Sequence, residues 1–254
     1  MIPADFSLKC PNCKAESLFR GLASSNTFGA IWFSDMKMVA EMLPDTPSLT
    51  VCEACNKFFW IKDIQREYRD YDYISKSNSK WVRFLTFDEY LSALKIKSIC
   101  NSDENERYIR IKIWWLFNDR VREKQDLFQS EEDQNTWKSN IERLIELLEN
   151  TDSDNKFILA DLYRNIGNFN QCLKLINSIN NPEDEWIKPQ YQKECGKKNT
   201  NVFKLDLKLK FVYQKKHEED KVKIEPIDSN LEKLFSETFW NYPYDIDADF
   251  HLYE

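Results

Sequence analysis

Four cysteines form two closely spaced pairs near the start of the chain. Cys10 and Cys13 make one Cys-x-x-Cys pair, and Cys52 and Cys55 make the other. A tight turn within each pair can aim both sulfurs at one point, so the two pairs can supply four thiolates to one tetrahedral metal ion. The aromatic run at 58–60 offers a small core that could shield the metal. The pattern therefore predicts a structural zinc ribbon with Zn²⁺ as its metal.

Two other interpretations of the paired cysteines stay open: two unrelated pairs of reduced thiols, or a redox-active Cys-x-x-Cys. A redox pair normally lies at a helix N-terminus in a strand–helix context, whereas the run at 58–60 favours a strand. The remaining cysteines, Cys100, Cys172 and Cys195, lie far apart in sequence. We expect ordinary thiols in or near the core, with Cys195 as an additional metal ligand the less favoured alternative.

A long insertion separates the two cysteine pairs. Residues 30–33 are predicted to form a strand, Ser34 and Asp35 are predicted to form a turn, and residues 38–43 are predicted to form the returning strand. A second turn at 44–47 then leads to the second pair. The insertion is therefore expected to be a β-hairpin between the two metal-binding halves.

The middle of the chain has helical periodicity. Thr86 and Glu89 make a capping box that begins a helix, and Ser130 is expected to cap another. Asp152 or Ser153 is expected to cap a later one. The expected helices cover about 87–99, 104–117, 131–149, 154–166 and 169–179. The second is apolar almost all round, so it should be the most buried.

A polar group follows that central helix. Asn118 and Asp119 are expected to end it, with Arg122 one turn further on. One interpretation is a polar functional site that uses these three residues and also Arg110. The favoured interpretation is a helix C-cap with a local ion pair.

Two stretches resemble a known group of proteins. The first contains Trp32, Ser34–Asp35, Met42–Pro44, Pro47, Leu49, the Cys52–Cys55 pair and Phe58–Trp60, and the second runs from Arg107 to Arg122. They resemble uncharacterised bacterial proteins that join an N-terminal zinc ribbon to a tetratricopeptide-like helical region. The resemblance implies that Cys10, Cys13, Cys52 and Cys55 are the metal ligands, and it brings no established activity. Lys14 and Asn56 depart from it, because many ribbons carry Gly there.

One further stretch, residues 162–173, looks like the middle of a tetratricopeptide repeat. Gly167 would permit the tight turn between two helices, and the small Cys172 would let the second helix pack closely. Such arrays need about three repeats to bury their faces, so the flanking helices would have to replace the missing ones.

The last quarter of the chain is divided by charge. Pro182 begins a helix that Pro189 should kink or split and that ends near Gly196. The segment 188–216 carries nine Lys against two acidic residues, and 218–254 carries eleven acidic residues against three Lys. Partial alternation predicts a strand at 202–213, followed by an acidic tail rich in aromatic residues.

Composition narrows the function classes. The chain has two His, four Gly and no phosphate loop, His-x-x-x-His pair or serine elbow, so we expect no enzyme. The leading hypothesis is a protein-interaction scaffold that binds another protein through its helical face. The alternative is nucleic-acid binding through the ribbon and the Lys-rich segment 188–216, although the pI near 5.2 speaks against it. No secretory signal or membrane span is expected, and the reduced cysteines favour a cytoplasmic protein.

These observations predict an α+β protein. We expect a zinc ribbon at 1–62, a linker at 63–82, a helical tetratricopeptide-like domain at 83–198, and a possible strand with an acidic tail at 199–254. The apolar stripes of the helices should face one another rather than the ribbon, so 83–196 should fold alone.

Overall fold

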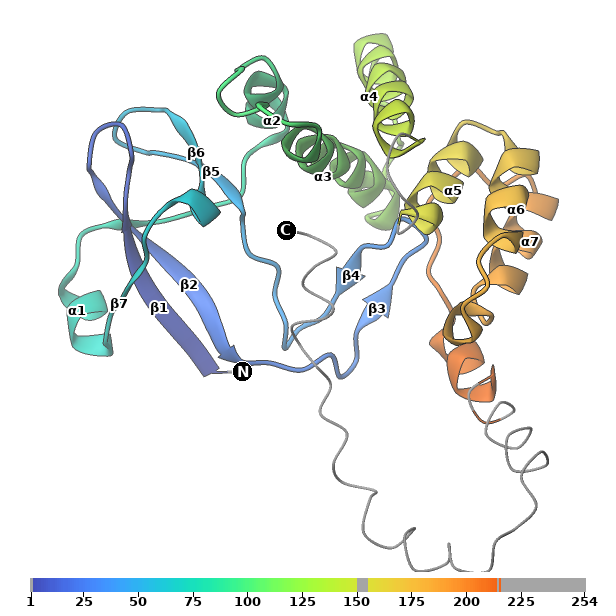
Figure 1. Ribbon diagram of the computed structural model, residues 1–254, viewed down its shortest axis with the longest axis horizontal. Coiled ribbons are helices and arrows are strands. Elements are labelled where there is room, and N and C mark those ends of the chain that lie inside the picture. The colour runs from blue at the N-terminus through green and yellow to red at the C-terminus, as the bar shows by residue number, and fades with distance from the viewer. Residues whose placement is uncertain (1, 150–154, 214, 216–254) are drawn as a thin grey trace, which may run out of the picture.

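The computed structural model describes residues 2–149, 155–213 and 215. Figure 1 shows a lobe of β-strands at one end and helices α5–α7 at the other, with the β3–β4 hairpin and helix α3 between them. Among the sequence predictions, the cap at Asp152 or Ser153 and the acidic tail at 218–254 lie outside the described residues. A strand-rich N-terminal part followed by a mostly helical part bears out the α+β class.

The first lobe is built on a long hairpin. Strands β1 (Ile2–Lys9) and β2 (Glu16–Ser24) pair antiparallel, with Phe6 opposite Phe19. The turn between these strands carries the first cysteine pair. The phenyl rings of Phe6 and Phe19 therefore share one face of the sheet, which packs toward the second cysteine hairpin.

Residues 63–82 complete this sheet. Strand β7 (Glu67–Tyr68) pairs antiparallel with β1, and β8 (Lys80–Trp81) pairs parallel with β2, giving the order β7-β1-β2-β8. Helix α1 (Tyr71–Lys76) connects the two added strands. This stretch belongs to the sheet rather than to a linker. Two-residue strands in a polar segment are too short to show a period, which explains why the sequence did not predict them.

Two more hairpins complete the N-terminal part. Strands β5 (Leu49–Val51) and β6 (Phe58–Trp60) pair antiparallel around the second cysteine pair, and the 3₁₀ turn η1 (Ile61–Asp63) follows. The predicted inserted hairpin is present but short, since β3 (Ile31–Trp32) pairs with β4 (Met38–Val39) only.

Helices α2 (Phe87–Leu94), α3 (Asp103–Arg122) and α4 (Glu131–Glu149) form the centre of the molecule. The capping box of Thr86 is confirmed, and the Ser130 hydroxyl accepts from the Asp133 N–H at 3.1 Å. The predicted end of α3 at 118–119 is wrong, because the helix continues to Arg122.

The C-terminal helices form a stacked pair and a split third helix. Helices α5 (Lys156–Asn165) and α6 (Phe169–Asn177) are joined by Gly167, whose φ of +80° favours glycine. The next helix is split as predicted, into a 3₁₀ turn η2 (Pro182–Asp184) and α7 (Lys188–Gly196).

The predicted strand at 202–213 is wrong. Residues 207–213 are helical, and only an isolated bridge between Lys204 and Phe33 remains of the expected β-structure. The Asp206 side chain accepts from the Lys208 N–H at 3.0 Å, as a helix N-cap does. Leucines and lysines follow it, and both are good helix formers, so local propensity outweighed a short alternation.

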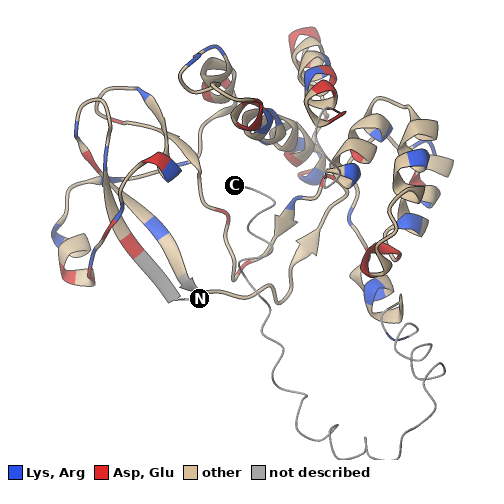
Figure 2. Ribbon diagram, in the orientation of Figure 1, with Lys and Arg blue, Asp and Glu red and all other residues tan. Residues whose placement is uncertain are grey.

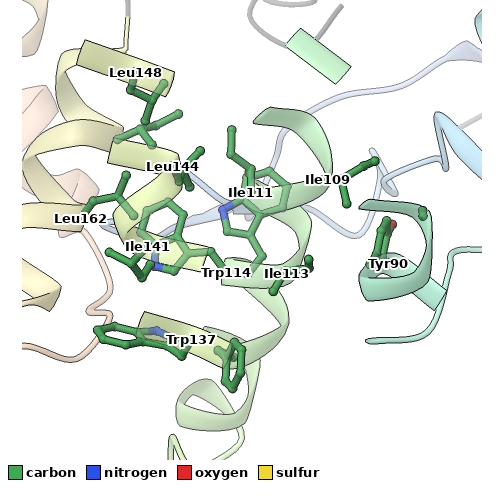
Figure 3. Packing of buried hydrophobic residues seen from close by; sticks show 14 of the residues in the cluster. Tyr90, Ile109, Ile111, Ile113, Trp114, Trp137, Ile141, Leu144, Leu148 and Leu162 are labelled. Atoms are coloured by element: carbon green, nitrogen blue, oxygen red, sulfur yellow. The ribbon is translucent and has the colours of Figure 1, made fainter. Parts of the chain in front are cut away.

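The main core joins the ribbon to the helices. Ile109, Ile113 and Trp114 of α3 are fully buried, and Figure 3 shows Trp114 beside side chains of α4. Leu49 and Trp60, from the second cysteine hairpin, lie in the same cluster. The expectation that the helical faces meet one another rather than the ribbon is therefore wrong, since part of their apolar surface is covered by β5 and β6.

The shared core predicts that a ribbon residue stabilises the helices. Leu49 is fully buried, so Leu49→Ala should lower the free energy of unfolding by about 2–5 kcal/mol, as other core truncations do. Urea denaturation followed by the helical circular dichroism signal measures this. Met42→Ala is the matched control, because Met42 is 36% exposed on the preceding segment. A helical midpoint unchanged by Leu49→Ala would contradict the shared core.

Candidate metal centre and the buried junction beside it

The first cysteine pair lies in the turn of the β1–β2 hairpin. The Cys10 N–H donates to the Ala15 carbonyl at 2.9 Å, and the Lys14 N–H donates to the Cys10 carbonyl at 3.0 Å. Lys14 has a φ of +64°, the left-handed conformation that the turn requires. These bonds hold the backbone in a compact knuckle.

The second knuckle repeats this geometry. The Cys52 N–H donates to the Lys57 carbonyl at 2.9 Å, and the Asn56 N–H donates to the Cys52 carbonyl at 2.8 Å. Asn56 has a φ of +55°. The positions where many ribbons carry Gly are therefore left-handed here as well. Neither knuckle lies at a helix N-terminus, which is the usual place of a redox pair.

The two turns bring the four sulfurs together. All four Sγ atoms lie within 4.8 Å of one another. The Sγ atoms of Cys10 and Cys55 are 3.8 Å apart, and those of Cys13 and Cys52 are 3.6 Å apart. Cys10 and Cys52 are buried, whereas Cys13 is exposed and Cys55 is half-buried. In the part of the chain that the structure describes, this is the one group of three or more His, Cys, Asp or Glu that could hold a metal ion.

Two of these thiols have pKa values that burial and hydrogen bonding shift in different directions. Burial raises the pKa of Cys52 to about 12. Burial opposes ionisation of Cys55 too, but hydrogen bonds from the Asn12 amide and the Lys57 backbone help to lower its pKa to about 7. Cys55 therefore ionises more readily than Cys52. Thiolates this close to one another would repel, and a bound cation would offset that repulsion.

A small apolar cluster packs against the two cysteine knuckles. It consists of Leu8, Phe19, Phe59 and Ile61 together with Cys10 and Cys52. Of the aromatic run at 58–60, Phe59 belongs to this cluster with Cys10 and Cys52 and is 4% exposed. Phe58 and Trp60 instead face the main core.

The other cysteines lie away from the four-sulfur cluster. Cys172 and Cys195 are both buried, and the Cys195 thiol donates to the Cys172 sulfur at 3.7 Å. Cys195 therefore lies with Cys172 between α6 and α7, and not in the candidate metal site. Burial raises the pKa of Cys172 above the usual range of a thiol. Cys100 is half-buried beside the main core.

A second group of polar residues connects the β3–β4 hairpin to the helices. Asp35, at the tip of the hairpin, is fully buried. Its carboxylate accepts from the Asn118 amide at 2.8 Å and from the Arg122 guanidinium. Asp119 pairs with Arg122 at 2.6 Å and with Lys37 at 2.7 Å. These residues hold a turn in place and do not cap the helix.

Ser34, the other residue of that tip, contacts a buried ion pair. Its hydroxyl donates to Asp161 at 3.2 Å, and Tyr191 donates to its backbone carbonyl at 2.6 Å. Arg164 pairs with Asp161 at 2.7 Å, and both side chains are fully buried. Burial raises the pKa of Asp161, and the Arg164 charge offsets this only in part.

Arg164 also holds the chain that follows α7. Its guanidinium donates to the carbonyls of Asn199 and Asn201 at 2.6 and 2.8 Å. The Arg164 guanidinium therefore connects the tip of the β3–β4 hairpin, helix α5 and the segment after α7.

The structure decides part of the sequence prediction for the polar group formed by Asn118, Asp119, Arg122 and Arg110. The local ion pair of Asp119 and Arg122 is confirmed, but Arg110 lies elsewhere, paired with Glu106 at 2.7 Å. Asp161 and Arg164 were not predicted from the sequence. The one local signal is their spacing, since opposite charges three residues apart on a helix can pair, but it does not reveal that both side chains are buried.

Comparison of the chain with protein-family models, with curated proteins and with solved structures finds no match. What the structure bears out of the family resemblance is the clustering of Cys10, Cys13, Cys52 and Cys55 as a possible metal site and a mostly helical C-terminal part. Among the described residues, no helix is both long and apolar enough to cross a membrane.

Proposed function

We propose that Cys10, Cys13, Cys52 and Cys55 bind one structural Zn²⁺ ion. The sulfur spacing carries this proposal. Four sulfurs at about 2.3 Å from a tetrahedral Zn²⁺ lie about 3.8 Å from one another, close to the observed 3.8 and 3.6 Å. Four thiolates complete the coordination and leave no position for water or substrate. The metal would therefore hold the two hairpins together and would take no part in catalysis.

We further propose that the protein is a non-catalytic scaffold that binds another protein in the cytoplasm. The ribbon and the helices share the core around Leu49 and Trp60, and the β3–β4 hairpin contacts the helices at Asp35. The two parts therefore form one connected structure. The α5–α6 pair, with Gly167 at its turn and the fully buried Cys172 in its contact, supports a tetratricopeptide-like unit within this structure.

Exposed aromatic residues at both edges of the β7-β1-β2-β8 sheet, and on α1, favour the N-terminal lobe as the contact region. Tyr68 is 68% exposed, Tyr71 is 85% exposed and Trp81 is 38% exposed. Arg20 lies over the Trp81 ring at 4.4 Å. Tyr, Trp and Arg are the residues that contribute most binding energy at protein interfaces. The α5–α6 pair exposes one large apolar residue, Ile166, so the earlier expectation of a helical contact face has less support.

A matched affinity purification tests the scaffold proposal. The double variant Tyr71→Ala and Trp81→Ala should lose at least ~90% of a co-purifying protein, because truncating interface anchors typically costs 2 kcal/mol or more. Quantitative mass spectrometry measures the recovery. Phe28→Ala is the control, since Phe28 is 84% exposed and lies outside this sheet and α1. Equal recovery with both variants would contradict the proposed surface.

Nucleic-acid binding stays as the second candidate, favoured by the lysines of α7 and the segment after it. Two of these lysines are already engaged, because Lys188 pairs with Glu185 and Lys197 with Glu194. If the segment binds DNA or RNA, affinity should fall steeply with salt as counterions are released. Fluorescence anisotropy of the full chain at two salt concentrations measures this, and selective sub-micromolar binding at physiological salt would favour this candidate over the scaffold.

A further inference from the structure

The last described helix presents an unusual outer face. Residues 207–213 and 215 are helical, and Lys208, Phe211, Val212 and Lys215 follow one another at the spacing of a single helix face. Phe211 is 69% exposed and Val212 is 61% exposed. Two apolar side chains are therefore flanked along the helix by two lysines.

The opposite face of this helix is anchored. Leu207, Leu209 and Tyr213 pack against the cluster that contains Trp186 and Tyr191. The helix is thus held beside α7 through the cluster that contains Tyr191, and Figure 2 shows a basic residue on this last described helix. Within the described residues, neither Lys208 nor Lys215 belongs to an ion pair. An exposed apolar pair flanked by two lysines suits a partner that is both apolar and acidic.

The chain itself supplies a segment of that chemistry. Beyond residue 217 it carries eleven acidic residues against three Lys. Residues 244–250 alternate strictly, with Asp245, Asp247 and Asp249 between Tyr244, Ile246, Ala248 and Phe250. In an extended conformation such a segment would direct three carboxylates to one side and four apolar side chains to the other.

We propose that residues 244–250 dock on the Lys208–Phe211–Val212–Lys215 face of the same chain. The apolar side of the segment covers Phe211 and Val212, and the long lysine side chains reach up to its carboxylates. The connecting residues 216–243 span up to roughly 90 Å when extended, so they can return to this helix. A tether of this kind gives an effective concentration on the order of millimolar, which favours the same chain over a second copy.

Docking would make the tail a competitor for the basic surface. Any nucleic acid or acidic protein that approaches the lysines after α7 must first displace residues 244–250. The inference does not depend on the proposed ribbon contact, because it uses a different surface and a different part of the chain.

Zero-length cross-linking of the full chain tests the proposal. A carbodiimide joins a carboxylate to a lysine only when they are in contact, and mass spectrometry of the digest identifies the linked residues. We expect links from Asp245, Asp247 or Asp249 to Lys208 or Lys215. The double variant Phe211→Ser and Val212→Ser keeps every linkable group, and it should reduce these links at least ~10-fold. Phe28→Ser, on another exposed aromatic residue, should leave them unchanged.

A reciprocal variant and an isotope mixture complete the design. Replacing Tyr244, Ile246 and Phe250 with Ser keeps the three carboxylates but should also reduce the links at least ~10-fold. Circular dichroism and the urea midpoint verify that each variant folds. Links that persist in either apolar variant would overturn the proposal, as would their absence from the native chain. Mixing ¹⁵N-labelled with unlabelled chains should give links within one isotope only, and mixed links would show a second copy as the occupant.

Discussion

Removing the metal is expected to unfold the ribbon. Cys52→Ser should abolish stable metal binding, because it removes one of the four cysteines of the proposed site, and the group contains no fifth donor. Metal binding contributes roughly 10–16 kcal/mol in zinc-finger peptides near neutral pH. That is comparable to the whole stability of an ordinary domain, about 5–15 kcal/mol, so the β1–β2 and β5–β6 hairpins should separate. Because β5 and β6 also cover the main core, the helices should be destabilised as well.

Metal analysis and a chelator titration measure this effect. The native chain should carry about one zinc per molecule and lose it to a thiol-modifying reagent. The affinity should fall as pH falls, because protons compete with the metal for the thiolates. Cys100→Ser is the matched control, since this half-buried thiol lies outside the cluster. Full zinc retention by Cys52→Ser, or a native chain without zinc, would refute the proposed centre.

Features with a local signature were predictable from the sequence. The spacing of Cys10–Cys13 and Cys52–Cys55 predicted the four-sulfur cluster, because each knuckle is a turn of a few residues. The Thr86 capping box and the apolar stripe of α4, from Trp137 to Leu148, likewise depend on neighbours three or four residues away. Such patterns can be recognised before the rest of the fold is known.

Features that depend on distant partners were not predictable. Ser34 and Asp161 are 127 residues apart in the sequence, and no local pattern connects them. Strands β7 and β8 form only because β1 and β2 offer unpaired edges. Asn118 resembles a residue that ends a helix, yet its amide is used by Asp35 on another element. In each case a tertiary contact decided what a short polar segment became.

Breaking the buried ion pair at the junction should have the second largest effect. Arg164→Met should lower the free energy of unfolding by about 3–5 kcal/mol, because it leaves the Asp161 carboxylate buried without its partner. The carbonyls of Asn199 and Asn201 lose their donor as well.

A double variant separates the two contributions of Arg164. Replacing Asp161 with Leu in the Arg164→Met background removes the uncompensated charge, so part of the stability should return. Recovery should stay incomplete, because the two carbonyls after α7 still have no donor.

Urea denaturation measures the free energy of unfolding of the native chain, of Arg164→Met and of the double variant. Arg143→Met is the control, since Arg143 is 41% exposed in its pair with Glu106, and exposed pairs contribute about 1 kcal/mol or less. Arg164→Met should still bind about one zinc, because the hydrogen bonds of Arg164 go to Asp161, Ser34 and two carbonyls after α7, and to none of the four cysteines. A cost for Arg164→Met no larger than that of the control would mean that Asp161 is neutral in the native protein, held by the Ser34 hydroxyl and not by a charge.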